Sequence, residues 1–182
     1  CVEQSLHNAE MCCLVETFPA KHEDYDDYVK TLKCAYLYGK TVTLVNTHWP
    51  ETNAKMLKNR RIGLSQSGIV QAFNKHGRRT MLGWCDDAYS YVKELDTEYS
   101  NWLCVPKSIK MTSIKPSGTV SLLNGSTPGI HFPEDEYYIR RIRFSNTSKV
   151  LKSLIKAGYN VEDDEYSPNT SVVEFPVKEP HF

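Results

Sequence analysis

The sequence lacks the features that mark several common protein classes. No apolar run approaches the roughly 20 residues that a membrane-spanning helix needs, and no secretory signal is visible. Lysine plus arginine equals aspartate plus glutamate, at 22 each, so no excess of positive charge favours binding to nucleic acid. No repeat or low-complexity tract occurs. We therefore expect neither a membrane nor a nucleic acid as a partner.

The cysteines also lack the spacing of a metal site. No C-x-x-C pair is present, and two adjacent cysteines are too close for an ordinary zinc pair. Six cysteines can pair in fifteen ways, but they are sparse for a small secreted scaffold. We expect a reducing, cytoplasmic setting in which most of these thiols are free. The six are Cys1, Cys12, Cys13, Cys34, Cys85 and Cys104.

Hydrophobic periodicity alternates strands with helices along the chain. Tyr25, Tyr28, Leu32 and Tyr36 recur at helical spacing after a potential cap at Asp24. Such alternation predicts an α/β fold with a largely parallel sheet, in one folding unit over residues 1–182. The predicted helices are 24–46, one beginning at Trp49-Pro50, 86–103 and 147–157. The predicted strands are 62–68, with a tight turn at its end, 108–114, 137–144 and 171–177. Residues 1–19 are interpreted as a loop that runs into an apolar segment, 14–18, stopped by Pro19. The acidic stretch 162–165 is interpreted as a solvated loop rather than a metal site.

The segment from Lys115 to Ser121 reads KPSGTVS and follows a predicted strand. Gly118 permits close approach of a ligand to the backbone, and hydroxyls with successive N–H groups suit a phosphate. The segment is not a Walker loop, because the GxxxxGK[ST] spacing is absent. A turn that simply caps a helix explains the same residues, so both interpretations stay open at this point.

A second candidate constellation lies at the beginning of the sequence. Cys1 is two residues before Glu3, and Cys12 follows eleven positions after Cys1. A thiol is a hydrogen-atom donor or nucleophile, a carboxylate can move a proton, and a second thiol can close a disulfide. The alternative is that Cys12 and Cys13 are small buried hydrophobic residues. A hydrolytic cysteine would need a histidine base, and none of the six histidines has a recognisable protease context.

Four short blocks of sequence, taken together, indicate a protein family more specifically than any one block does. They are CVE at residues 1–3, Cys12 with LVE at 14–16, NRRIGLSQSG at 59–68, and IKPSGTVSLLNGSTPGIHFP at 114–133. Along nearly the whole chain this pattern resembles the catalytic half of ribonucleotide reductases of the adenosylcobalamin-dependent, class II type. The resemblance implies half of a ten-stranded α/β barrel, with a finger loop at the N-terminus and the second half-barrel over residues 1–182.

The resemblance also implies roles for individual residues. Cys1 matches the cysteine that becomes a thiyl radical and removes the ribose 3′ hydrogen. Glu3 matches the acceptor of the 3′-hydroxyl proton, and Cys12 matches one of two reducing thiols. Ser117, Gly118 and Thr119 match the loop that holds the phosphates, and Cys13 is interpreted as a bystander.

The implied activity is allosterically regulated reduction of ribonucleoside triphosphates to deoxyribonucleotides, the precursors of DNA replication. Adenosylcobalamin would be bound mainly by parts outside this chain, and a dithiol such as thioredoxin would supply electrons. We expect that an upstream half-barrel is absent and that the chain alone is inactive. Its start at Cys1 is compatible with an intein junction, a split gene or a truncation.

Three alternatives remain at this stage. One is a class I type reductase that uses a separate radical-generating subunit. Another is a non-catalytic nucleotide-binding module based on the 117–121 turn. The third is a thiol hydrolase with Cys1 as its nucleophile.

Overall fold

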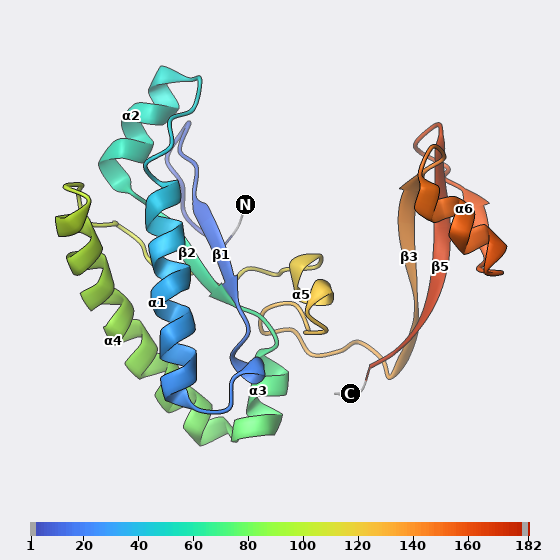
Figure 1. The fold of residues 1–182 in the computed structure, drawn as a ribbon, viewed down its shortest axis with the longest axis horizontal. Coiled ribbons are helices and arrows are strands. Elements are labelled where there is room, and N and C mark those ends of the chain that lie inside the picture. The colour runs from blue at the N-terminus through green and yellow to red at the C-terminus, as the bar shows by residue number, and fades with distance from the viewer. Residues whose placement is uncertain (1–2, 180–181) are drawn as a thin grey trace. The chain divides into compact units, whose positions relative to one another are not determined.

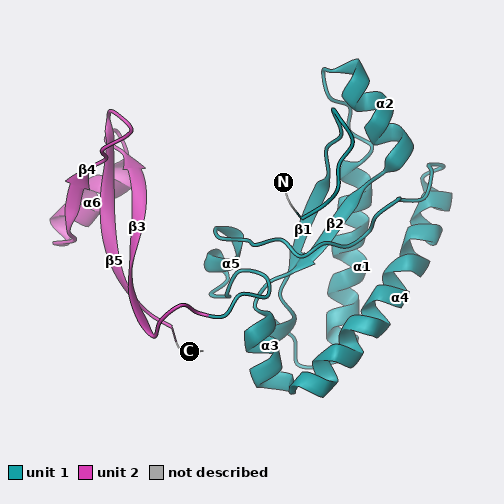
Figure 2. Cartoon of the chain, turned by 180° about the vertical axis from the view of Figure 1, so that it is seen from behind, with its two compact units in different colours: residues 1–132 teal, residues 133–182 magenta. Residues whose placement is uncertain are grey.

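The structure is a computed structural model that describes residues 3–179 and residue 182. It divides into two compact units, residues 1–132 and residues 133–182 (Figure 2). The sequence predicts a single folding unit, whereas each of these units buries apolar side chains of its own. Unit 2 has Leu151, Val172 and Val173 at its centre.

Unit 1 is built from two parallel strands and several helices (Figure 1). Strands β1 and β2 pair in register from Cys13 opposite Ile62 to Thr17 opposite Gln66. This part of the predicted parallel sheet is confirmed. The elements are β1 (Cys13–Thr17), η1 (Pro19–Lys21), α1 (Tyr25–Val42), α2 (Pro50–Asn59), β2 (Ile62–Gln66), α3 (Ile69–His76), α4 (Arg78–Trp102) and α5 (Val120–Leu123).

The predicted strand 108–114 is only partly formed. It lies beside β2 and makes one parallel bridge, between Thr112 and Leu64. The N–H groups of Ile62 and Leu64, two residues apart, bond to the carbonyls of Lys110 and Met111, which are adjacent. This change of step breaks the regular ladder, so the strand prediction is wrong for most of the segment.

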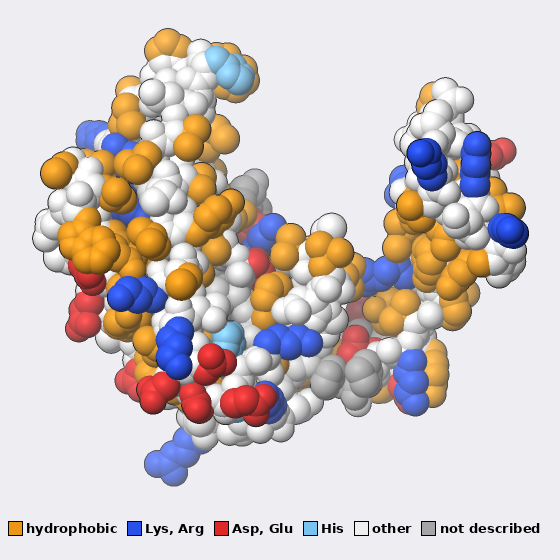
Figure 3. Space-filling model, in the orientation of Figure 1, with side chains coloured by type: hydrophobic (Ala, Val, Ile, Leu, Met, Phe, Trp, Pro, Cys, Tyr) orange, Lys and Arg blue, Asp and Glu red, His pale blue; other side chains and the backbone are white. Residues whose placement is uncertain are grey.

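Helix α1 begins where its sequence predicts. The Asp24 side chain accepts a hydrogen bond from the N–H of Asp27 over 2.8 Å and so satisfies one free donor of the first turn. Asp26 and Asp27 place further negative charge near the positive end of the helix dipole, and acidic side chains gather around this end of α1 in Figure 3. The helix ends at Val42, four residues earlier than predicted.

The remaining helices of unit 1 differ more from the sequence prediction. Pro50 opens α2 as expected. Helix α4 begins at Arg78, eight residues before the predicted start at 86, and α3 was not predicted at all. Gly77, at a φ of 82°, separates these two helices.

The core of unit 1 lies between the β1–β2 sheet, α1 and α4. Tyr28, Tyr36 and Tyr99 are fully buried, and Trp84 stacks on Tyr28 with ring centroids 6.0 Å apart. Aromatic rings thus fill much of the space between the two long helices. The buried cluster is Tyr28, Leu32, Tyr36, Ile62, Leu64, Ala72, Met81, Trp84, Ala88, Val92, Leu95 and Tyr99.

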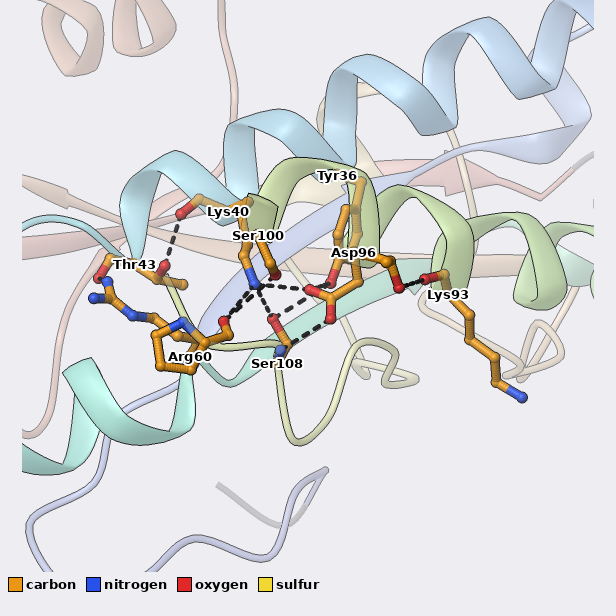
Figure 4. Close-up of polar contacts among 10 residues, drawn as sticks. Tyr36, Lys40, Thr43, Arg60, Lys93, Asp96, Ser100 and Ser108 are labelled. Atoms are coloured by element: carbon orange, nitrogen blue, oxygen red, sulfur yellow. Dashed lines mark hydrogen bonds and ion pairs between the residues drawn. The ribbon is translucent and has the colours of Figure 1, made fainter. Parts of the chain in front are cut away.

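An ion pair is buried in the same core (Figure 4). Lys40 Nζ of α1 lies 2.8 Å from Asp96 Oδ1 of α4, and it also donates to Ser108 Oγ over 3.0 Å. Asp96 accepts two more bonds, from the Tyr36 hydroxyl and the Ser108 N–H. The pair joins both long helices to the segment that leads to Thr112.

Unit 2 consists of an antiparallel sheet of order β3–β5–β4 and one helix. The prediction of a largely parallel sheet is therefore wrong here, because β3 and β5 run in opposite directions from Tyr137–Lys178 to Ser145–Thr170. Tyr137 and Ile139 are about 60% exposed, and hydrophobic side chains cover this part of the sheet in Figure 3. The elements are β3 (Tyr137–Ser145), α6 (Lys149–Lys156), β4 (Val161–Asp163) and β5 (Thr170–Lys178).

The acidic stretch 162–165 is not simply a loop. Glu162 and Asp163 belong to β4, where Glu162 forms an ion pair with Arg141, and Asp164 pairs with Arg143 at 3.0 Å. Arginines of β3, which is separated from β4 by β5, thus pair with these carboxylates. Among the described residues, no group of three or more His, Cys, Asp or Glu side chains is placed to hold a metal ion.

None of the helices in residues 3–179 combines the length and the apolar character required to cross a bilayer.

Candidate active site

One face of β1 packs against α1. A Cβ built on Gly39 of α1 would come within 3.2 Å of Val15 Cγ2. Thr17 lies on the same face, because its Oγ1 is 3.2 Å from the hydroxyl oxygen of the buried Tyr28. Since strand side chains alternate, Cys13 belongs to this helix-facing set, and it is only 8% exposed.

The opposite face of the sheet carries the other side chains. A Cβ on Gly63 of β2 would lie 2.5 Å from Leu14 Cδ2, and Ser65 Oγ donates to Glu16 Oε1 over 3.1 Å. The same alternation brings Cys12, just before β1, to this side. We call this surface, formed by Cys12, Leu14, Glu16, Gly63 and Ser65, the site face.

The N-terminal segment crosses the site face. Gln4 Nε2 donates to the carbonyl oxygen of Ile62 over 3.2 Å, and Ser113 Oγ donates to that of Glu3 over 3.3 Å. A Cβ on Gly63 would be only 2.4 Å from Gln4 Nε2. The absence of a side chain at residue 63 therefore makes room for the segment that carries Glu3.

Glu10 fixes the far end of this segment. Its buried carboxylate accepts hydrogen bonds from Arg61 Nε at 3.0 Å, Asn59 Nδ2 at 2.8 Å and the N–H of His7 at 2.9 Å. Burial opposes ionisation, but the hydrogen bonds from Arg61, His7 and Asn59 outweigh it and lower the pKa of Glu10 to about 2. Glu10 is thus a charged anchor at neutral pH.

Glu3 and Cys12 lie in one electrostatic environment. Burial raises the pKa of the Cys12 thiol, and the nearby Cys13 and Glu3 raise it further. The thiol form of Cys12 is therefore favoured at neutral pH, as a hydrogen donor requires.

A pocket of about 280 Å³ joins Glu3 to the segment around the candidate phosphate loop. Glu3 and Pro116 both line this pocket, although more than a hundred residues separate them in the sequence. The lining residues are Glu3, Ile114, Pro116, Ile130 and His131.

The predicted phosphate-binding residues differ in accessibility. Ser117 is 1% exposed; its Oγ accepts from the N–H of Ser121 and its own N–H donates to the Lys115 carbonyl over 2.8 Å. These groups of Ser117 are engaged within the turn, as the capping interpretation expects. Gly118 and Thr119 are exposed, and a Cβ on Gly118 would meet nothing within 4 Å.

No family model matches the chain. Individual relatives do match, over 97% of its length. It is 55% identical to a probable adenosylcobalamin-dependent ribonucleoside-triphosphate reductase of Dictyostelium discoideum and 52% identical to an adenosylcobalamin-dependent ribonucleoside-triphosphate reductase of Euglena gracilis. A solved B12-dependent, class II ribonucleotide reductase superposes on 98% of the chain with a TM-score of 0.79 and 33% identity. The chain is similar to one segment of class II ribonucleotide reductases.

This segment is a minor part of those reductases. The chain spans 23% of the Dictyostelium protein, 24% of the Euglena protein and 29% of the solved chain. The resemblance to class II ribonucleotide reductases, inferred from the four sequence blocks, is confirmed. The mixed α/β content that it implies is confirmed as well.

The site residues expected from the reductase resemblance are brought partly together. Glu3 lies near Cys12 and shares a pocket with Pro116, next to Ser117. Cys1 lies outside the described residues, so its role stays a prediction.

Other residues of the candidate site were not predicted. Glu16, Ser65 and Ser67 form a hydrogen-bonded group on the site face, and His131 lines the pocket. Ser65 and Ser67 were interpreted only as small residues of a strand and turn. The alternation of β1 would have placed Glu16 on the same face as Cys12 rather than in the core.

Proposed function

We propose that this chain is the catalytic segment of an adenosylcobalamin-dependent reductase that converts ribonucleoside triphosphates to 2′-deoxyribonucleotides. The observation that carries the proposal is the shared pocket of Glu3 and Pro116. A nucleotide there has a proton acceptor at one side and the Gly118–Thr119 turn beside it. The relatives named as cobalamin-dependent favour this proposal over a reductase with a separate radical-generating subunit.

In this proposal each residue has a defined role in the reaction. The Cys1 sulfur, as a thiyl radical, takes the 3′ hydrogen of the ribose, and Glu3 accepts the 3′-hydroxyl proton. The C2′–O bond then breaks, and the oxygen takes one thiol proton and leaves as water. Cys12 and a second thiol of the complete protein lose two electrons and form a disulfide, and these electrons with the other thiol proton supply the new hydrogen on C2′. Glu3 returns its proton to the 3′ oxygen, and Cys1 finally returns a hydrogen to C3′, which regenerates the thiyl radical.

The Cys12 environment fits the reducing role. Burial keeps Cys12 protonated, so it can deliver both a proton and an electron. An external dithiol such as thioredoxin would reduce the disulfide. The cysteines of the described part, Cys12, Cys13, Cys34, Cys85 and Cys104, are all unpaired, which supports a reducing, cytoplasmic setting.

The phosphate tail would lie along the exposed Gly118 and Thr119. Backbone N–H groups and the Thr119 hydroxyl suit phosphate oxygens. The buried Ser117 would act indirectly, by shaping the turn through its bond with Ser121.

We place residues 1–182 in one catalytic barrel of the complete protein, with the N-terminal segment as its finger loop. The parallel β1–β2 pair would belong to the second half-barrel, and other parts of the protein would supply the first half. Because the chain spans only 23–24% of the two relatives, most of the cobalamin surface would also come from other parts of the complete protein. When bound, adenosylcobalamin would supply the one-electron chemistry that oxidises the Cys1 thiol.

The test uses the complete protein with adenosylcobalamin, a dithiol and a ribonucleoside triphosphate. The wild type should form the deoxyribonucleotide, and Cys1→Ser should abolish turnover while nucleotide binding is retained. Cys34→Ser, at an exposed position of α1, is the matched control and should keep wild-type turnover. Turnover by Cys1→Ser, or a wild type that binds nucleotides without reducing them, would contradict the proposal.

A further inference from the structure

A carboxylate on the site face holds two serine hydroxyls. Glu16 Oε1 accepts hydrogen bonds from Ser65 Oγ at 3.1 Å and from Ser67 Oγ at 2.5 Å. Glu16 comes from β1, and the serines come from the end of β2 and the turn after it. The three side chains therefore join neighbouring parallel segments at the same edge of the sheet.

Each serine also accepts an N–H group from a distant part of the chain. The Lys115 N–H donates to Ser65 Oγ over 2.8 Å, and the Gly129 N–H donates to Ser67 Oγ over 3.1 Å. A hydroxyl has one proton, and donating it to Glu16 turns the oxygen lone pairs toward these amides. Glu16 thus orients both acceptors.

The two amides are the ends of one loop, residues 115–129. A Cβ on Gly129 would lie 2.8 Å from the Lys115 carbonyl oxygen, so the ends of the loop nearly touch. The φ of Gly129 is 49°, a conformation that favours glycine. Gly118 and Thr119 lie between these ends.

We propose that Glu16 is a positioning residue that, through Ser65 and Ser67, holds both ends of the 115–129 loop in place for the phosphates of the nucleotide. This inference rests on the proposed function. Glu16 acts through the serines and touches neither the phosphates nor the reacting ribose atoms.

The environment of Glu16 supports a role as hydrogen-bond acceptor. Burial raises the pKa of Glu16 despite the bonds from Ser67 and Ser65 and the charge of Lys115. Its second oxygen, Oε2, is buried and has no hydrogen-bond partner among the described residues. One oxygen, Oε1, accepts from both serines, so an amide oxygen in the same place should replace it.

The kinetic test compares Glu16→Leu with Glu16→Gln in the complete protein. Loss of two oriented hydrogen bonds in Glu16→Leu should raise the KM for the ribonucleoside triphosphate about tenfold and change kcat much less. Glu16→Gln should restore KM to within about threefold of the wild type. Thr17→Val is the matched control, because Thr17 is adjacent but its side chain lies on the helix-facing side of β1, where it donates to the Ser65 carbonyl over 2.8 Å.

A second measurement does not depend on turnover. Hydrogen exchange of the Lys115 and Gly129 amides should become at least about tenfold faster in Glu16→Leu and remain slow in Glu16→Gln and Thr17→Val. If Glu16→Leu does not fold, the double variant Ser65→Ala/Ser67→Ala provides the same comparison.

The outcomes separate the two proposals. Unchanged exchange at both amides, or equal acceleration in Thr17→Val, overturns the role of Glu16 even if the wild type reduces nucleotides. Accelerated exchange with an unchanged KM overturns the link to phosphate binding. A wild type without reductase activity contradicts the proposed function. The hydrogen-exchange result then still tests whether Glu16 holds the ends of the 115–129 loop.

Discussion

Gln4 lies so close to Gly63 that a Cβ at residue 63 would be 2.4 Å from its Nε2 atom. The contact places the N-terminal segment directly on the backbone of β2. Because Gln4 follows Glu3, the position of the proposed proton acceptor depends on a residue that has no side chain.

We expect Gly63→Ala to displace the N-terminal segment. The variant should lose about 1–3 kcal/mol of unfolding free energy, since Gln4 or Leu14 must move, and turnover of the complete protein should fall. Denaturant unfolding and steady-state assays measure the two effects. Gly83→Ala is the matched control. Gly83 lies in α4, and a Cβ built there would have no neighbour within 4 Å. The stability of this variant should therefore stay the same or rise by up to about 1 kcal/mol. Equal effects of both variants would contradict the contact.

The two adjacent thiols should respond differently to substitution. Cys12→Ser should abolish dithiol-dependent turnover, because serine cannot form the disulfide. Cys13→Ala should retain turnover and lose about 1 kcal/mol of stability, because Cys13 packs toward α1. Assays of deoxyribonucleotide formation and thermal unfolding test this. The reverse result, with turnover lost only in Cys13→Ala, would contradict the assignment of faces.

Removing Lys40 should strongly destabilise unit 1. Lys40→Met leaves Asp96 as a buried carboxylate without its cation, which typically costs about 3–5 kcal/mol. The double variant Lys40→Met/Asp96→Asn should recover part of this loss, because no buried charge remains. Unfolding free energies of both variants and of Asp96→Asn form a double-mutant cycle. Strict additivity would show that the two groups do not interact.

The lowered pKa of Glu10 predicts that the protein loses stability in acid. Its pKa in the folded protein is about 2, below the ordinary 4.5, so the ionised form stabilises the fold above about pH 4.5. That contribution, at most about 3 kcal/mol, is lost as the pH falls toward 2. The stability difference between wild type and Glu10→Gln should therefore shrink from pH 5 to pH 2. The difference should stay within about 0.5 kcal/mol at every pH for Glu51→Gln, an exposed α2 residue. A difference that does not change with pH for Glu10→Gln would contradict the shift.

Local signals in the sequence predicted much of unit 1. The Asp24 cap, Pro50 and the period of the tyrosines identify α1 and α2, because they depend on neighbours within a few residues. The path of the segment near Thr112 depends on tertiary hydrogen bonds, such as that of Ser108 with Asp96. The antiparallel sheet of unit 2 was missed for a related reason, since strand direction depends on partners distant in sequence.

The candidate site was predicted unevenly. Resemblance in sequence identified Glu3 and Cys12, whose proximity the structure supports. Glu16, Ser65 and Ser67 carry no distinctive spacing and become a group only where β1 and β2 pair. The sequence predicts Ser117 as a phosphate ligand because a serine hydroxyl can bind phosphate. In the structure, however, this hydroxyl oxygen accepts the N–H of Ser121 within the turn.

The alternation along β1 directs the sulfur atoms of Cys12 and Cys13 to opposite faces of the sheet. Deleting one residue between Cys13 and Glu16 would rotate the start of the strand by half a pleat and exchange them. The Cys13 sulfur, now buried on the helix-facing side, would then lie on the site face, while the Cys12 sulfur would turn toward α1.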